Sequence, residues 1–188
     1  MDEPGKMHFR RMDEGTDADF AVLARVHEEN IRKLPGLLMG LLTNLRADEA
    51  YPVDRLEHSL QAATRAHRDG RDEEYVVCAL LHDIGDTLAS HNHADVAAAI
   101  LRPFVSEANL WMVEKHAVFQ GYYFFHHLGM DRDARERFRD HPWFERTAEF
   151  CERYDGPAFD PRAEHLPLAF FEPMVRRVFT MPRISTEA

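Results

Sequence analysis

The sequence predicts an all-α protein. Apolar residues recur at intervals of three and four along most of the chain, Gly and Pro punctuate these segments, and no β-branched run alternates with polar residues over more than a few positions. The chain has 188 residues, of which 45% are hydrophobic, enough for one core. We therefore expect a single domain over residues 1–188, with a loose N-terminal tail at residues 1–15.

The first helix is predicted to begin at Thr16. Thr16 and Asp19 match a capping box, and the apolar-periodic segment 20–34 follows. The dipeptide Pro35-Gly36 is predicted to break this helix, because proline lacks the amide N–H that the helix ladder needs.

A second, short buried helix is expected at residues 37–45, and residues 47–52 are expected to form a loop. Residues 20–50 together are the natural candidate for a lid, since they are rich in Leu and Met and contain a Pro-Gly break that could act as a hinge. The remaining helices are predicted at residues 53–69, 72–82, 93–102, 107–127, 141–155 and 168–179, each ending at or near Gly or Pro or at a polar segment.

The charge of the chain limits its partners. The formal net charge is −10, and such a surface repels nucleic-acid phosphates and anionic lipid, so we expect neither nucleic acid nor membrane as a main partner. The polar N-terminus lacks the apolar segment of a signal peptide, and Cys78 and Cys151 are expected to be reduced core thiols. The chain is therefore predicted to be cytoplasmic; its oligomeric state is not predicted.

Several metal-binding residue types fall on helix faces that should be buried. The chain has 12 histidines, and His116 shares a face with Met112 and Phe119. His93 and Asp155 occupy similar positions on two other apolar faces, and the pair His82-Asp83 follows a strongly apolar helix. Burying one such group without a partner costs several kcal/mol, but a divalent metal shared by several of them removes that cost. The pattern therefore predicts metal binding.

The segment LLHDIGD, residues 80–86, resembles the core motif of the HD-domain superfamily, an all-α helical bundle. The signature has a histidine, a His-Asp pair and a distant aspartate, which here are His58, His82-Asp83 and Asp155. The segment EHSLQ at residues 57–61, with His93 and His116, resembles the branch of mixed-valent di-iron oxygenases. Within that branch the phosphonate-cleaving enzymes are most similar, over the segments EHSLQAATRA, ALLHDIGD, NHADVAAAILRPF, EKHAVFQGYYFFHHLG, HPWFERTAEFCERYD and FFEPMVRRVF.

The resemblance implies two iron ions in the Fe(II)/Fe(III) form. One would take His58, His82 and Asp155, and the other His93 and His116. Asp83 would bridge them, since a carboxylate offers two oxygens whereas an imidazole has one free lone pair. His91 lies two residues from His93 and could be confused with it; we prefer His93 because it starts an apolar stripe.

The activity that the resemblance implies is the O2-dependent cleavage of the C–P bond of an organophosphonate. The expected substrate is (R)-1-hydroxy-2-(trimethylammonio)ethylphosphonate, and the products are glycine betaine and phosphate. The amine, N-methylated amines and other hydroxy-phosphonates stay open as substrates. The reacting species would be oxygen bound to a metal, and no side-chain nucleophile is predicted.

Two kinds of substrate contact are predicted, one for each charged end of the substrate. Quaternary ammonium groups are recognised by aromatic faces and carboxylates, which favours Asp86 and one or two members of the run Phe119, Tyr122, Tyr123, Phe124 and Phe125. Asp86 could instead pair with Arg102 or cap a helix. For the phosphonate, the candidates are Lys115, Gln120 and Arg153, although Arg153 lies far around the helix from Asp155 and would then face solvent.

Two other functions compete with the oxygenase. Ordinary HD proteins use the same ligands to activate water against a nucleotide or another phosphoester, and some of them are dinuclear. A non-catalytic HD module is the third possibility, but such a module would be expected to have lost ligands.

Overall fold

The computed structural model describes residues 6–45, 51–180 and 182–183, and none of these residues forms a β-strand. The predicted all-α fold is therefore confirmed. The α-helices are α1 (Asp17–Asn44), α2 (Arg55–Arg68), α3 (Glu73–Leu81), α4 (Asp86–Ala89), α5 (His93–Leu101), α6 (Glu107–Phe124), α7 (Phe144–Phe150) and α8 (Leu168–Val178). Short 3₁₀ helices lie at Met12–Glu14, Ser90–Asn92, Phe125–Leu128 and Ala134–Phe138, and a π-helical turn spans Cys151–Asp155.

Side-chain caps fix where most of the long helices begin. Thr16 and Asp19 form the predicted capping box at the start of α1. Asp54 accepts a hydrogen bond from the Glu57 amide at the start of α2, and Asp72 does the same for Tyr75 at the start of α3. The segment expected to be a loose tail includes the 3₁₀ turn Met12–Glu14, and its first five residues lie outside the described part of the chain.

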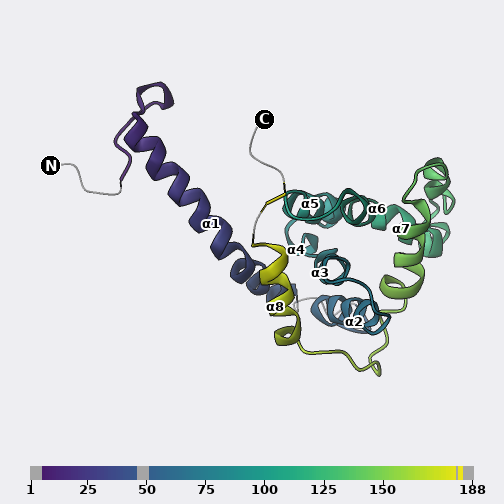
Figure 1. Ribbon diagram of the computed structural model, residues 1–188. Helices are drawn as coiled ribbons and strands as arrows, with labels where there is room; N and C mark the ends of the chain where they lie inside the picture. The colour runs from purple at the N-terminus through teal and green to yellow at the C-terminus, as the bar shows by residue number, and fades with distance from the viewer. Residues whose placement is uncertain (1–5, 46–50, 181, 184–188) are drawn as a thin grey trace.

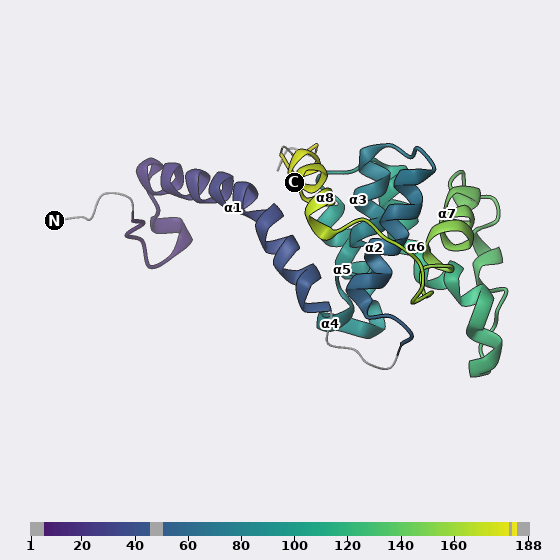
Figure 2. The ribbon, with the colours of Figure 1, turned by 90° about the horizontal axis from the view of Figure 1, so that it is seen from below.

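The predicted break at Pro35 is wrong, because α1 runs through it without interruption. Pro35 is buried, and apolar residues on both sides of it pack against the core, including Leu34 and Leu38. This packing outweighs the hydrogen bond that proline cannot donate, and Figure 2 shows α1 changing direction part-way along instead of ending. The predicted short helix 37–45 is thus the second half of α1, and most of the predicted loop at 47–52 lies outside the described residues.

The core of the protein lies between α2, α3 and the helices around them. Figure 1 shows α3 among α2, α6 and α8, which pack against it, while the N-terminal half of α1 projects away from this bundle in both ribbon views. Seven consecutive residues of α3, from Tyr75 to Leu81, are fully buried. The metal-binding residue types that follow α3 therefore emerge inside the bundle rather than at its surface.

The C-terminal helices depart from the prediction at their ends. The helix expected over 107–127 changes from α to 3₁₀ geometry after Phe124, and the helix expected over 141–155 begins at Phe144. It ends in the π-helical turn, which the Gly156 amide closes by donating to the Cys151 carbonyl at 2.8 Å. π-helical turns often occur at functional sites, and this one carries Asp155.

Among the described residues, none of the helices has the length and apolar character needed to cross a lipid bilayer. Cys78 and Cys151 are both buried and free, as expected for core thiols.

Candidate metal centre

Four histidines enter the bundle from four different elements, and all four are held in the same way. His58 lies on α2, His82 caps the end of α3, His93 begins α5, and His116 lies in α6. In each, Nδ1 faces a backbone carbonyl, with distances of 3.1 Å (His58 to Ala158), 2.8 Å (His82 to Ala79), 3.0 Å (His93 to Ser90) and 2.7 Å (His116 to Val113). A carbonyl only accepts, so Nδ1 donates and each Nε2 presents a lone pair to the interior.

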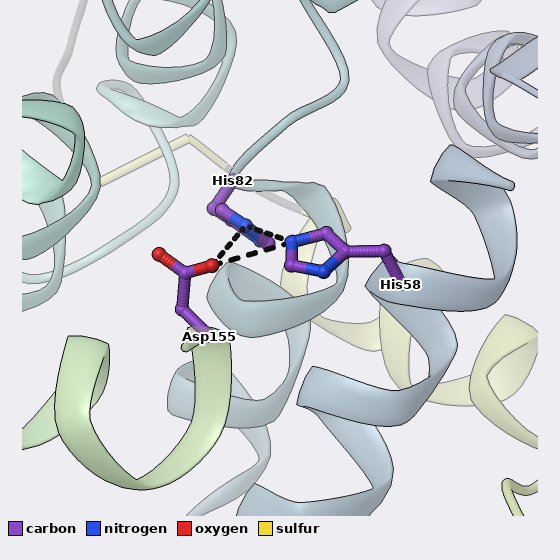
Figure 3. Close-up of side chains that lie close together, drawn as sticks. All are labelled: His58, His82 and Asp155. Carbon is purple, nitrogen blue, oxygen red and sulfur yellow. Dashed lines mark hydrogen bonds and ion pairs between the residues drawn. The ribbon is translucent and has the colours of Figure 1, made fainter. Parts of the chain in front are cut away.

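His58, His82 and Asp155 form the first group (Figure 3). The two Nε2 atoms of His58 and His82 are 3.1 Å apart, and Asp155 Oδ1 lies 3.3 Å and 3.7 Å from them. All three side chains are buried. The three ligand atoms therefore face one small volume.

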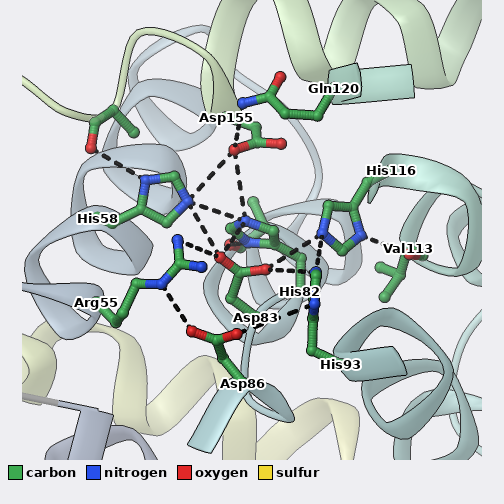
Figure 4. A network of polar contacts seen from close by, with 12 residues as sticks. Arg55, His58, His82, Asp83, Asp86, His93, Val113, His116, Gln120 and Asp155 are labelled. Carbon is green, nitrogen blue, oxygen red and sulfur yellow. Dashed lines mark hydrogen bonds and ion pairs between the residues drawn. The ribbon is translucent and has the colours of Figure 1, made fainter. Parts of the chain in front are cut away.

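His93 and His116 form the second group, and Asp83 lies between the two (Figure 4). The Nε2 atoms of His93 and His116 are 3.2 Å apart, and Asp83 Oδ1 lies 3.3 Å and 3.2 Å from them. The other oxygen, Asp83 Oδ2, lies 3.5 Å from Nε2 of both His58 and His82. One carboxylate thus offers one oxygen to each histidine pair, which is the geometry of a bridging ligand.

The residues present fit a pair of divalent or trivalent cations. Ligands about 2.1 Å from a shared ion lie roughly 3.0–3.4 Å from one another, close to the separations found here. Two imidazole lone pairs that face each other at 3.1 Å repel unless a proton or a cation lies between them. Asp155 Oδ2 is buried without a hydrogen-bond partner, which leaves a carboxylate oxygen free for a ligand.

The charges of the cluster raise the pKa of two of its histidines and lower the pKa of its aspartates. Burial opposes the charged imidazole, but the contact with Asp155 and the charges of both aspartates raise the pKa of His58 above its ordinary value overall. The pKa of His82 is also raised, because Asp83 and Asp155 outweigh its burial. Burial raises the pKa of the two carboxyl groups, but the neighbouring histidines lower the pKa of Asp83 and Asp155 well below the usual range.

These pKa shifts predict that protons and metal ions compete for the same imidazole nitrogens, so that metal binding depends on pH. Groups with a raised pKa stabilise the metal-free protein below about pH 6.5, and this stabilisation is lost as the pH rises through their folded pKa. Metal needs the neutral imidazoles, so its affinity rises over the same interval. We expect the increase in Tm on metal loading to grow as the pH rises above about 6.5, the ordinary pKa of histidine. Differential scanning fluorimetry with and without metal measures it, and a pH-independent increase would contradict the assignment.

A cavity of about 290 Å³ lies against the cluster. Its lining comprises Tyr51, Arg55, Asp83, His93, His116, Ala117, Gln120, Phe124, Asp155 and Phe159. Gln120 donates from its amide to Asp155 at 3.1 Å, and its buried oxygen has no hydrogen-bond partner. From the aromatic run of the sequence analysis, Phe124 lines the cavity. The cavity is near the lower end of the range of about 300–1,000 Å³ that is usual for small-molecule sites.

Several lining residues were not predicted as site residues from the sequence. Arg55 is the first residue of α2, a position that usually faces solvent, and Phe159 stacks on His58 with ring centroids 4.3 Å apart. Asp86 does not pair with Arg102; it accepts a hydrogen bond from Arg55 Nε at 2.8 Å. Arg55 and Asp86 are 31 positions apart, so no local pattern reveals their contact.

Gln120, a predicted substrate contact, lines the cavity, whereas Asp86, Tyr123, Lys115 and Arg153 do not. Tyr123 is 42% exposed and is not among the lining residues. Lys115 pairs with Glu114. Arg153 is half exposed and donates to Asp69 and Glu149, so it faces solvent as the helix geometry indicated.

His93 and His91 offer a matched pair for testing the second group. His93 lies within 3.3 Å of Asp83, whereas His91 is exposed and contacts none of the cluster side chains. We expect His93→Ala to lower the metal content of the purified protein from two ions per chain to one, because His116 and one oxygen of Asp83 are too few ligands. His91→Ala should keep two. Metal analysis of both variants gives the answer, and equal metal contents would contradict the assignment of His93.

Comparison with known proteins agrees with this geometry. The family model described as "HD domain" matches residues 55–153, which include five of the six cluster residues. Over 98 residues the chain is 34% identical to the [1-hydroxy-2-(trimethylamino)ethyl]phosphonate dioxygenase (glycine-betaine-forming) of Leisingera caerulea. The aligned region covers 45% of the chain and 50% of that relative, so the chain spans about half the length of the protein it matches. The resemblance recognised in the sequence is thereby confirmed.

Proposed function

The chain belongs to the HD-domain family, a family of metal-binding domains, and we propose that it is a di-iron oxygenase of organophosphonate breakdown. The proposed reaction uses O2 to split the C–P bond of (R)-1-hydroxy-2-(trimethylammonio)ethylphosphonate, giving glycine betaine and phosphate. The similarity to the Leisingera caerulea dioxygenase supports this choice of reaction. We also propose that residues 1–188 form one HD domain, since α1 and α8 pack on each other and on the helices that carry the site.

The observation that carries the proposal is the position of Asp83 between two histidine pairs. Its two oxygens lie 3.2–3.5 Å from four Nε2 atoms, which supports a two-metal centre with a bridging carboxylate. A pair of irons at this place would supply the oxidising power that no amino-acid side chain has. The cluster residues would orient the metals through fixed imidazole rings, each with its Nδ1–H held by a carbonyl.

The cavity would receive the substrate beside this centre. Its size favours a small metabolite over a nucleotide, and its wall combines aromatic rings with one guanidinium. Phe124 and Phe159 offer faces to a quaternary ammonium group, which cannot donate N–H hydrogen bonds. The buried position of the cluster would keep bulk water away from the reacting atoms.

The test compares two reactions in one preparation. The protein is expressed with iron and kept anaerobic, and the hydroxylated trimethylammonio-ethylphosphonate is added before and after O2. Phosphate and glycine betaine that appear only after O2 support the proposal. His116→Ala, which removes a ligand of the second group, should show no turnover under either condition.

A phosphohydrolase is the second candidate, because the same histidine–aspartate cluster could bind two metals that activate water. In that case phosphate would be released from a nucleotide or a phosphomonoester without O2. Release of this kind, together with no reaction of the phosphonate, would overturn the oxygenase proposal.

A further inference from the structure

Arg55 is fixed on three sides at the edge of the metal centre. Its side chain is 12% exposed, its Nε donates to Asp86 at 2.8 Å, and its Nη1 lies 3.3 Å from Asp83 Oδ2. The guanidinium also lies over the ring of Tyr51, 4.5 Å from the centroid. The stack and the two carboxylates hold the guanidinium in one orientation before any ligand arrives.

This guanidinium keeps unused donors. Arginine has five N–H donors, and Nη2 of Arg55 makes no hydrogen bond with the residues that the structure describes. Figure 4 shows one terminal nitrogen of Arg55 with a marked contact to Asp83 and the other without a marked contact. Arg55 lines the cavity together with Asp83, His93 and His116, so a ligand beside the metals would lie next to this guanidinium.

The structure describes all the residues that line the cavity, and among them Arg55 is the one with a Lys or Arg side chain. The cavity wall also contains the carboxylates of Asp83 and Asp155, so an anion that binds there needs a fixed positive group beside it. A planar guanidinium matches the oxygens of a phosphonate or phosphate better than an ammonium does, because it can donate two parallel hydrogen bonds. Apart from Arg55 and the histidines, Gln120 is the lining side chain that carries N–H donors. Its amide donates to Asp155.

We propose that Arg55 binds the phosphonate oxygens of the substrate and thereby sets which end of the molecule points to the metals. The proposal rests on the proposed function for the identity of the substrate. It also assigns Asp86 a different part from the one predicted for it: its carboxylate holds Arg55, and the cationic end is left to the aromatic faces of Phe124 and Phe159.

The test measures binding without turnover. Wild type, Arg55→Gln and Arg55→Lys are loaded with iron and titrated anaerobically with methylphosphonate and with inorganic phosphate by calorimetry. We expect Arg55→Gln to weaken both by about tenfold or more, the loss usual for a charge-assisted hydrogen bond. Arg55→Lys should lose less, since it keeps the charge but not the fork. Arg68→Gln, on the exposed end of the same helix, should bind like wild type.

Metal content and choline binding separate this role from a structural one. If Arg55 binds the anion, Arg55→Gln keeps two metals per chain and its affinity for choline is unchanged. Unaltered anion affinity in Arg55→Gln, or loss of metal along with the anion, would overturn the proposal. Should Arg55→Gln not fold, the comparison of Arg55→Lys with wild type decides. Anion binding that depends on Arg55, without turnover that depends on O2, would overturn the oxygenase proposal alone. O2-dependent turnover with an unchanged KM in Arg55→Gln would overturn the proposed role of Arg55 alone.

Discussion

Asp83→Asn is expected to remove most of the thermal stabilisation that metal gives the wild-type protein. A ligand present at 1,000 times its Kd stabilises a folded protein by about 4 kcal/mol, and a protein of 150–250 residues gains about 2–4 °C in Tm per kcal/mol. Metal loading should therefore raise the Tm of this 188-residue chain by about 8–16 °C. In Asp83→Asn the increase should fall to less than about half.

The reason is that both histidine pairs share this one carboxylate. An asparagine keeps the shape of the side chain, but only one of its two terminal atoms is an acceptor, so it cannot give one ligand atom to each pair. One of the two histidine pairs therefore loses the carboxylate oxygen that lies 3.2–3.5 Å from its Nε2 atoms, and the bridge between the pairs is lost. Removing the negative charge also leaves less to offset the cations in a buried place.

The measurement is the difference in Tm with and without metal, because the metal-free variant has its own stability. Asp95→Asn is the matched control, since Asp95 is an exposed acid in the first turn of α5. Its metal-induced increase should equal that of wild type. An Asp83→Asn protein that still binds two ions and gains the full increase would show that Asp83 does not bridge.

The sequence was a good guide to the residues that repeat a local pattern. His116 and Asp155 occupy buried helix faces, as their apolar neighbours indicated, and Thr16 caps α1 as its spacing from Asp19 predicted. The pair His82-Asp83 could be recognised because a buried helix leads directly into it. In each case the deciding interactions lie within one or two helical turns.

The features that could not be predicted depend on contacts between distant segments. Arg55 acquires its position from Asp83 and Asp86, about 30 residues later in the chain, and Phe159 reaches His58 across the fold. Pro35 looked like a helix end because proline usually disrupts a helix, but the packing on both sides of it outweighs that local cost. Propensity is a weak guide wherever such tertiary contacts compete with it.

Gly85 lies where the turn after α3 meets the start of α5, and Gly85→Ala is expected to lower both the stability and the metal content of the protein. A Cβ atom at Gly85 would lie 2.5 Å from the His93 carbonyl oxygen and 2.7 Å from Val96 Cβ. The first of these contacts is with backbone, so no flexible side chain can relieve it, and α5 must move away from the turn that follows α3. The glycine after the His-Asp pair is thus explained by close approach, not by its φ of −80°.

The movement would separate Asp83 from His93, because the two residues lie on opposite sides of this contact. We expect Gly85→Ala to destabilise the protein by about 1–3 kcal/mol, as overpacking of a buried site does. At about 2–4 °C per kcal/mol the Tm should fall by about 2–12 °C. The metal content should fall from two ions per chain towards one, since His58, His82 and Asp155 do not touch the displaced helix start.

Gly40→Ala provides the control within the same protein. Gly40 lies in the interior of α1, and a Cβ atom there would meet nothing within 4 Å. Alanine favours the helix over glycine by about 0.5–1 kcal/mol, so this variant should be slightly more stable than wild type and keep both metals. Thermal melts and metal analysis of the two variants side by side distinguish a steric effect at Gly85 from a general response to Gly→Ala. A Gly85→Ala protein with two metals and an unchanged Tm would contradict this prediction. It would mean that the turn after α3 and the start of α5 can separate freely, and that the close contact at Gly85 does not position the second histidine pair.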